Sequence, residues 1–260
     1  MTKVRLAISP CPNDTCMFHA VVHGLVDCEG LEFEVEYHDI EELNRGAMAG
    51  EVDMSKISCA VLPAITKEYA LLDSGAALGR GNGPLLVQRK GFQGALKRVA
   101  VPGEYTTANA LVSGLFPLID ERVPMLFSEI AEAVERGDFD GGVLIHEGRF
   151  VYERRNLELV ADLGVEWERM TDLPLPLGGI VVRRSLGEEI KGKVERVLRR
   201  SIEYAFANPM ASRDYVKMYA RELEDDVIDK HIALFVNEFS LSLGADGRRA
   251  ISYLTGEVYE

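Results

Sequence analysis

Apolar and polar residues follow two different periods along the first two thirds of the chain, and the two periods take turns. Alternating or continuously apolar runs predict strands at 3–9, 31–38, 54–63, 97–103, 121–127 and 141–146. Runs with a helical period lie between them, at 14–25, 40–50, 106–116 and 128–137. Strands that alternate with helices are typical of βαβ units, so this order predicts an α/β fold with parallel sheets.

The last third of the chain, from Gly187 onward, has a mostly helical pattern. Its apolar residues recur at helical spacing in four successive segments, 188–207, 212–223, 225–240 and 246–258. We therefore expect a group of helices to follow the alternating part of the chain.

A short motif occurs once in each half of the alternating part. Gly50 to Asp53 reads Gly-Glu-Val-Asp, Gly137 to Asp140 reads Gly-Asp-Phe-Asp, and each precedes a strand run. The repeat predicts two lobes of similar build. The alternative is coincidence, because glycine ends helices in many α/β proteins.

Two apolar runs marked by glycine and proline, 81–91 and 174–184, flank the second unit. We expect them to carry the chain into a second lobe and back. The predicted division is a first lobe of 1–90 plus 178–260 and a second lobe of 91–177. A cleft between two hinged lobes is a common place to bind a small molecule.

Composition and charge narrow the class of partner. The 260 residues are 47% hydrophobic and 27% charged, an ordinary globular mixture, and the formal net charge is -13 without a long basic run. Binding of nucleic acid or of an anionic membrane is therefore not expected, and a small-molecule ligand is. No signal peptide or apolar stretch of about 20 residues is found, so we expect a cytoplasmic protein. The oligomeric state stays open, with a homodimer as one alternative.

Candidate ligand-binding residues follow from the strand pattern, because ligands of open parallel sheets bind beyond the carboxyl ends of the strands. Helix N-termini at these places present unpaired N–H groups and suit a carboxylate or another anion. The polar residues found there are Ser9, Asn13, Asp14, Thr15, Ser58, Thr106 and Thr107.

The loop Pro-Cys-Pro-Asn-Asp-Thr at 10–15 is stiffened by its two prolines. Such a loop would fix how Asn13, Asp14 and Thr15 approach the cleft. The alternative for Asp14 or Thr15 is a role as N-cap of the following helix. The same choice applies to Thr106 and Thr107, and we expect one of these two as cap and the other as ligand donor.

His146 is the candidate base. It ends the apolar run Gly-Gly-Val-Leu-Ile, at the carboxyl end of a predicted strand. Imidazole titrates near neutral pH, so a partly enclosed histidine suits removal of a proton from carbon next to a carbonyl. A structural role is the alternative, and whether Glu147 assists His146 stays open.

The remaining histidines and the cysteines are expected to have other roles. His19 and His23 have metal-ligand spacing on a helix but no third ligand, so no metal site is predicted. His38 and His231 are expected in surface or packing roles. The cysteines show no C-x-x-C pair, and Cys11 has no activating base near it in sequence.

Three segments together resemble a known family. The sequences SPCPNDTCMFHAVVHG, TTANAL and GGVLIHEGRF resemble those of the 1,4-dihydroxy-6-naphthoate synthases (the MqnD family) of the futalosine route to menaquinone. The resemblance covers nearly the whole chain. Cys16 departs from the phenylalanine that this family has at that position.

The resemblance implies a two-lobed fold of the type II periplasmic-binding-protein kind, with a ligand cleft between the lobes. It implies a lyase that converts cyclic dehypoxanthine futalosine to 1,4-dihydroxy-6-naphthoate without a metal or redox cofactor. His146 matches the family's base, and Ser58 with Thr106, Thr107 and Ala108 matches positions that hold the ligand. The rival interpretations are a chorismate dehydratase of the same pathway, a non-catalytic small-molecule binding protein and a ligand sensor.

Overall fold

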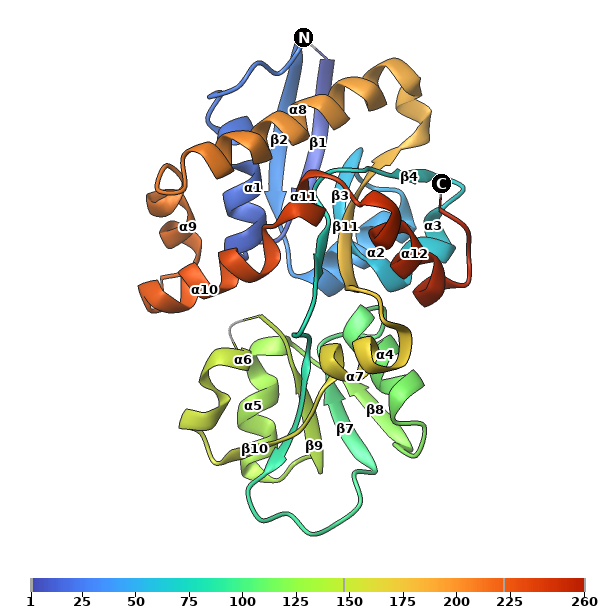
Figure 1. Cartoon of the computed structure of the whole chain (residues 1–260), viewed down its shortest axis with the longest axis vertical. Coiled ribbons are helices and arrows are strands. Elements are labelled where there is room, and N and C mark those ends of the chain that lie inside the picture. Colours follow the sequence, from blue (N-terminus) through green and yellow to red (C-terminus); the bar gives the residue numbers. More distant parts are fainter. Residues whose placement is uncertain (1, 147, 222, 260) are drawn as a thin grey trace.

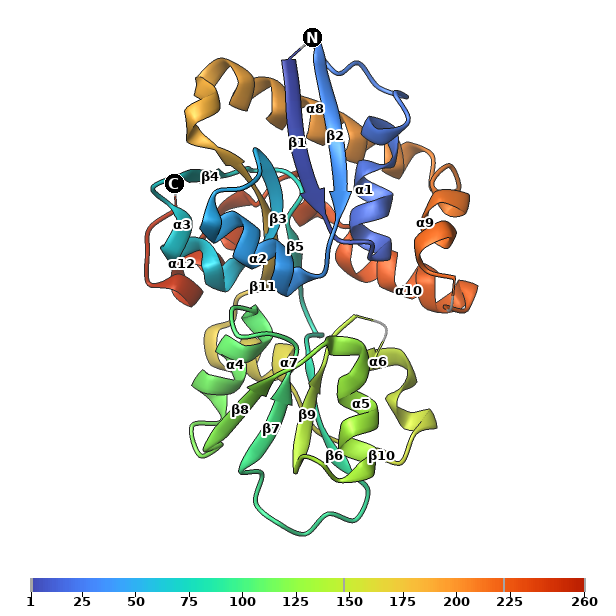
Figure 2. The same ribbon diagram turned by 180° about the vertical axis from the view of Figure 1, so that it is seen from behind.

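The computed structural model describes residues 2–146, 148–221 and 223–259. It contains two separate sheets, each covered by helices, which form two lobes joined by extended crossing segments (Figures 1 and 2). The strands of the first sheet are β1 (Thr2–Ile8), β2 (Leu31–Tyr37), β3 (Met54–Ser58), β4 (Tyr69–Leu71), β5 (Ala77–Gly79) and β11 (Leu175–Arg183). Those of the second are β6 (Leu85–Arg89), β7 (Arg98–Val101), β8 (Glu121–Pro124), β9 (Gly141–Leu144) and β10 (Leu157–Asp162).

The helices follow the same division into an upper and a lower lobe in Figure 1. The first lobe carries α1 (Pro12–Val22), α2 (Ile40–Ala49), α3 (Leu62–Ile65), α8 (Gly187–Ala207), α9 (Arg213–Tyr219), α10 (Asp225–Phe235), α11 (Glu238–Leu241) and α12 (Gly244–Thr255). The second carries α4 (Thr107–Leu115), α5 (Phe127–Arg136), α6 (Gly148–Val151) and α7 (Leu163–Thr171). Three 3₁₀ turns, η1 (Cys59–Val61), η2 (Tyr152–Arg154) and η3 (Arg184–Leu186), complete the described elements.

Parallel pairing, as predicted, forms the centre of each lobe. Strand β1 pairs in parallel with β2 and β3, and β7 pairs in parallel with β8 and β9. The crossing strands add antiparallel pairs that the alternating pattern did not predict. Strand β11 runs antiparallel to β3, and β6 runs antiparallel to β9. Because these strands enter or leave a lobe at its edge facing the other lobe, their direction opposes that of the βαβ strands.

Two predicted elements differ in extent. The run 54–63 is a strand only as far as Ser58, after which the chain turns into η1 and α3. The run 225–240 is two helices, because Val236 is extended and Asn237 caps α11 by accepting from the backbone N–H of Phe239. Local periodicity did not show either break.

The repeated motif has the same structure in both lobes. Gly50 and Gly137 both end a helix in the left-handed region, with φ of 68° and 84°. The carboxylates of Asp53 and Asp140 then accept from a backbone N–H of a neighbouring strand, at Arg5 in β1 (3.0 Å) and Arg98 in β7 (2.8 Å) respectively. The motif that is repeated in the sequence therefore corresponds to a hydrogen-bond pattern that the two lobes share.

The first lobe's core lies between β1 and the helices α1 and α8. Helix α8 has an apolar face of residues three to four positions apart, which packs with Val4 and Leu6 of β1 and Phe18 of α1. Full burial of each such side chain stabilises the fold by roughly 1.5–3 kcal/mol. This packing fixes where α1 begins, at the edge of the sheet that faces the second lobe (Figure 2). Among the described residues, no helix is long and apolar enough to cross a membrane.

The division of the chain between the lobes at residues 90/91 and 177/178 stays a prediction. Strand β6, at 85–89, pairs with β9 and β10 of the second sheet. We therefore propose that the first crossing falls just before β6, at 80–84, rather than at residue 90.

Two glycines pack backbone against backbone where the chain first crosses. A Cβ added at Gly164 would lie 2.3 Å from the carbonyl carbon of Asn82 and 2.6 Å from the backbone nitrogen of Gly83. We expect Gly164→Ala to lower the free energy of unfolding by about 1–3 kcal/mol, because neither backbone can move away cheaply. Urea unfolding measures this loss.

The matched control is Gly114→Ala in the exposed part of α4. A Cβ there meets no atom within 4 Å. Alanine at this position should stabilise the protein by roughly 0.5–1 kcal/mol, because glycine is the weaker helix former. Equal effects of the two substitutions would contradict the close contact at Gly164.

Candidate functional site

A cavity lies between the two lobes and is lined from both of them. It contains about 740 Å³ of empty space, part of which is open to solvent. Its lining residues are Ser9, Asn13, Ile40, Lys56, Ser58, Ala77, Gly83, Pro84, Thr106, Thr107, Ala108, Ile145, His146, Arg149, Leu177, Gly178, His231 and Phe235. Most of this surface is apolar, with a few polar groups, as in typical small-molecule sites.

Most of the predicted site residues meet at this cavity. Those that line it are Ser9, Asn13, Ser58, Thr106, Thr107, Ala108 and His146. Asp14 and Thr15 are fully buried but are not among the lining residues, so they stand behind the wall. Contact of any of these residues with a ligand stays a prediction.

Helix α1 begins at a different N-cap residue from those considered in the sequence analysis. Cys11 occupies the N-cap position and Pro12 is the first helical residue, where its missing N–H costs nothing. The hydroxyl of Thr15 donates to the backbone oxygens of Cys11 (2.9 Å) and Pro12 (3.3 Å). Neither Asp14 nor Thr15 caps the helix, because both lie inside its first turn. The alternative role of Asp14 or Thr15 as the N-cap is therefore wrong.

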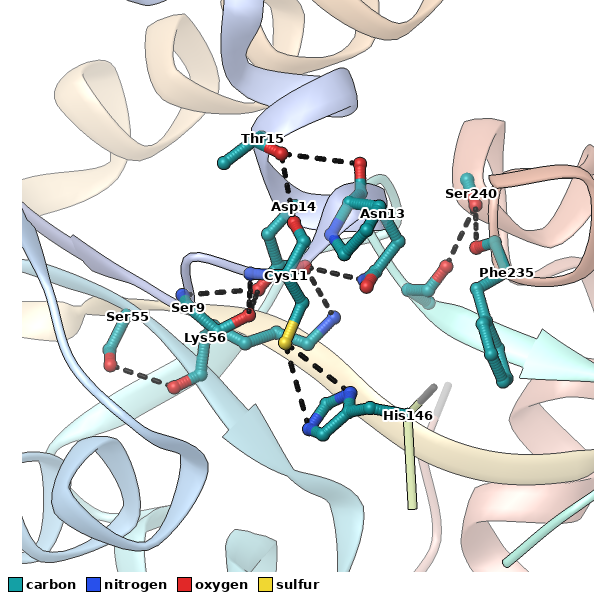
Figure 3. Close-up of polar contacts among 12 residues, drawn as sticks. Ser9, Cys11, Asn13, Asp14, Thr15, Ser55, Lys56, His146, Phe235 and Ser240 are labelled. Carbon is teal, nitrogen blue, oxygen red and sulfur yellow. Dashed lines mark hydrogen bonds and ion pairs between the residues drawn. The ribbon is translucent and has the colours of Figure 1, made fainter. Parts of the chain in front are cut away.

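Asp14 is the centre of a buried polar cluster (Figure 3). Its carboxylate accepts from the Ser9 hydroxyl (2.7 Å), from the Ser9 backbone N–H (3.2 Å) and from Asn13 Nδ2 (2.7 Å). The Lys56 ammonium lies 3.1 Å from Asp14 Oδ1. The three hydrogen bonds and the nearby ammonium compensate for the removal of the carboxylate from water.

Lys56 is a site residue that sequence reasoning missed. It lies in β3, its side chain is only 6% exposed, and it lines the cavity. Although it pairs electrostatically with Asp14, its ammonium makes no aligned hydrogen bond within the described part of the chain. A lysine inside the apolar run 54–63 was the available signal, because lysine is rarely buried without a partner. The arrangement leaves donor capacity for an anion in the cavity.

The hydroxyl groups of Thr106, Thr107 and Ser58 differ in the hydrogen bonds that remain available to a ligand. Thr106 is the N-cap of α4, accepting from Asn109 N, as expected for one of the two threonines. The Thr107 hydroxyl donates its proton to the backbone oxygen of Leu177 (2.8 Å), so this proton is not available to a ligand. The threonine hydroxyls are thus already engaged by protein groups.

Ser58 is placed differently. Asn44, which is fully buried, donates to Ser58 Oγ (3.0 Å) and accepts from the Ser58 backbone N–H (2.8 Å). Because the oxygen already accepts, the Ser58 proton is the part of the hydroxyl that remains for a ligand. Asn44 therefore orients Ser58 from behind.

His146 stands between β9 and α6 with φ of 52°, in the left-handed region that is uncommon for residues other than glycine. Its ring lies edge-on to Phe127, with centroids 5.0 Å apart, and its Nδ1 is 3.3 Å from Cys11 Sγ (Figure 3). Cys11 thus has an imidazole neighbour, which is distant in sequence and was not expected. Glu147, the candidate partner of His146, lies outside the described residues.

His231 is the second histidine of the cavity, and its expected role in surface or packing was too narrow. The ring is fully buried in α10, stacks on His146 with centroids 6.0 Å apart, and hydrogen-bonds Asn13 Oδ1 through Nε2 (3.0 Å). Burial, and then the nearby His146 and Lys56, hold the pKa of His231 well below its usual value. The ring is therefore neutral at physiological pH.

The charge of the lining favours an anionic ligand. Lys56 and Arg149 are its cations, and no carboxylate is among the described lining residues. Arg149 is held by Asp162 (3.0 Å) and by the backbone oxygen of Gly83. Each of these cations also pairs with a carboxylate outside the lining, Lys56 with Asp14 and Arg149 with Asp162, so a ligand carboxylate would share them with these partners. Within the described part of the chain, no group of three or more metal-binding side chains comes together.

Solved structures place this architecture in a known class. A Candida albicans protein, described as having the generic periplasmic-binding-protein fold, aligns with a TM-score of 0.70 at 13% identity, covering all of this chain and 92% of that one. A crystal structure of an Archaeoglobus fulgidus protein aligns with a TM-score of 0.92 at 36% identity, covering 97% of this chain and 95% of that one. The chain is thus a periplasmic-binding-protein-like α/β protein, which confirms the predicted fold class.

Sequence relatives identify the family. A family model described as menaquinone biosynthesis matches residues 4–260. Proteins named 1,4-dihydroxy-6-naphthoate synthase from Thermus thermophilus and Streptomyces coelicolor are each 44% identical, covering 99% and 95% of this chain and 94% and 90% of theirs. The chain belongs to this menaquinone-biosynthesis family of 1,4-dihydroxy-6-naphthoate synthases, as the resemblance implied.

Proposed function

We propose that this protein is a lyase that converts cyclic dehypoxanthine futalosine to 1,4-dihydroxy-6-naphthoate and releases the sugar fragment, with His146 as general base. The observation that carries the proposal is the place of His146. It is the histidine that sequence reasoning selected, and it lies in the wall of a cavity whose described charged groups are cationic. The synthase relatives bear the name of this product.

The proposed reaction starts with removal of a proton from carbon next to a carbonyl. His146 accepts the proton and the electron pair moves into the enolate. When the carbon–carbon bond to the sugar fragment breaks, its electron pair leaves with that fragment, which takes up the proton held by His146, and the ring carbon keeps its oxygen as a carbonyl. The new ring then becomes aromatic, which makes the sequence of steps downhill. A single base contributes typically about 10²–10⁴-fold in rate, so orientation of the substrate and exclusion of water must provide much of the rest.

Binding of the substrate's carboxylate follows from the cations of the cavity. Lys56 offers a buried ammonium with spare donor capacity, and the Ser58 hydroxyl has its proton to give. The first N–H groups of α4, at Thr107 and Ala108, have no acceptor within the helix. We propose that these donors bind the substrate's carboxylate and that the reaction needs no cofactor.

The test is to mix the purified protein with cyclic dehypoxanthine futalosine in the presence of a metal chelator and without redox cofactors. We expect the naphthoate product, identified by absorbance and mass spectrometry. Chorismate serves as the second substrate, because a chorismate dehydratase is the rival in the same pathway. Turnover of chorismate alone, or turnover of neither compound, would contradict the proposed function.

A further inference from the structure

A chain of polar contacts runs behind the cavity wall from β3 to α10. Lys56 pairs with Asp14, Asp14 accepts from Asn13 Nδ2 (2.7 Å), and Asn13 Oδ1 contacts His231 Nε2 (3.0 Å). The proposed base chemistry of His146 does not involve this chain of contacts. All four side chains are buried.

The chain determines which nitrogen of His231 carries the proton. An ionised carboxylate only accepts, so the amide of Asn13 must point its NH₂ group at Asp14. The Asn13 oxygen then faces His231, and an oxygen that only accepts requires N–H at Nε2. A neutral imidazole with hydrogen on Nε2 has a bare lone pair at Nδ1. His231 Nδ1 is therefore an acceptor and not a donor.

This acceptor is buried and lacks a partner. In the residues that the structure describes, no donor reaches His231 Nδ1. Buried acceptors without hydrogen bonds are rare in proteins because their loss of water is not compensated. His231 lines the cavity, next to Lys56 with its own spare donor capacity. Two buried polar atoms of opposite kind at one cavity indicate a ligand that supplies a donor to the first and an acceptor to the second.

We propose that Nδ1 of His231 accepts a hydrogen bond from a ring hydroxyl of the bound ligand, and that Asn13 and Asp14 are positioning residues that hold His231 in this tautomer. The inference rests on the proposed function, since it names the product group, formed when the ring becomes aromatic, that meets His231. A carbonyl or carboxylate cannot fill the role, because neither has a proton to donate.

The neighbourhood of His146 selects the ring hydroxyl rather than a more distant group. The two imidazoles are stacked 6.0 Å apart, so a group bound at His231 lies close to the carbon from which His146 takes its proton. The carbonyl next to that carbon becomes a hydroxyl when the ring becomes aromatic. An acceptor at this place favours the hydroxyl form over the carbonyl form, and thus the product over the substrate.

The experiment compares two probes and two proteins. The probes are 1,4-dihydroxy-6-naphthoate, kept reduced under anaerobic conditions, and 2-naphthoate, which has the same ring and carboxylate without hydroxyls. The variant is His231→Gln, whose side-chain NH₂ can still donate to Asn13 Oδ1 while the ring acceptor is lost. We expect calorimetry to show about tenfold weaker binding of the dihydroxy compound and a change below about twofold for 2-naphthoate.

Nuclear magnetic resonance of the ¹⁵N-labelled wild-type protein gives a second readout that does not depend on a variant. We expect the bare nitrogen of His231 to be Nδ1, and its signal to move when the dihydroxy compound is added but not when 2-naphthoate is added. Equal weakening of both probes in His231→Gln, no weakening of either, or a proton on Nδ1 would overturn the inference. If the wild-type protein forms the naphthoate product while these results fail, only the role of His231 falls and the proposed function stands.

Discussion

Replacing His146 with asparagine is expected to lower kcat for the cyclic substrate by about 10²–10⁴-fold, the usual contribution of a general base. Asparagine is the variant of choice because His146 has a positive φ, which asparagine tolerates better than alanine does. The affinity for 1,4-dihydroxy-6-naphthoate should change by less than about fivefold, because the groups proposed to hold the carboxylate remain. Steady-state kinetics and calorimetry measure the two quantities.

The matched control is His38→Asn, which changes an exposed histidine that pairs with Glu36 and Glu42 on the surface. Its kcat should equal that of the wild type. If His146→Asn kept kcat within about threefold of the wild type, His146 would not be the base. A loss of ligand affinity as large as the loss of kcat would instead give it a binding role.

Asp14→Asn is expected to lower the free energy of unfolding by about 3–5 kcal/mol, as is typical when one partner of a buried ion pair is removed. The substitution leaves the Lys56 ammonium buried without its counter-charge. It also places an NH₂ group among donors, since Ser9 and Asn13 both direct N–H or O–H groups at this position. Urea unfolding at pH 7 measures the loss.

The exposed pair formed by Lys230 and Asp226 on α10 provides the comparison. These side chains are 3.0 Å apart and more than half exposed, so Asp226→Asn should cost no more than about 0.5 kcal/mol. If Asp14→Asn cost less than about 1 kcal/mol, the buried cluster would contribute little to stability. The role of Asn13 as a fixed link to His231 would then also lose support.

The parts of the fold that depend on local sequence were predictable. The strands β1, β2 and β7 and the helices α2, α4 and α5 lie within or close to the predicted runs, because one buried face imposes its period on the sequence. The break at Val236 was not predictable, because its surroundings remain apolar while tertiary packing and the Asn237 cap turn the chain. The antiparallel pairs of β11 with β3 and of β6 with β9 depend on where the chain crosses between the lobes, and no local sequence pattern indicates this.

The candidate site was predictable where one strand or one helix start decides the position. Ser9, Ser58 and His146 follow directly from the ends of strands, and the structure brings them to one cavity. Pairings between distant segments were not predictable. His231 is 218 residues from Asn13 and Cys11 is 135 residues from His146, so only the folded chain reveals either contact.

The contact between Cys11 and His146 joins the end of α1 in the first lobe to the loop after β9 in the second. Any separation of the lobes would pull the sulfur away from the ring and remove the imidazole from its first-lobe neighbours. The proposed base therefore has these first-lobe contacts only while the two lobes are together. We therefore expect closure of the lobes on the substrate to be the step that brings the proposed base into place.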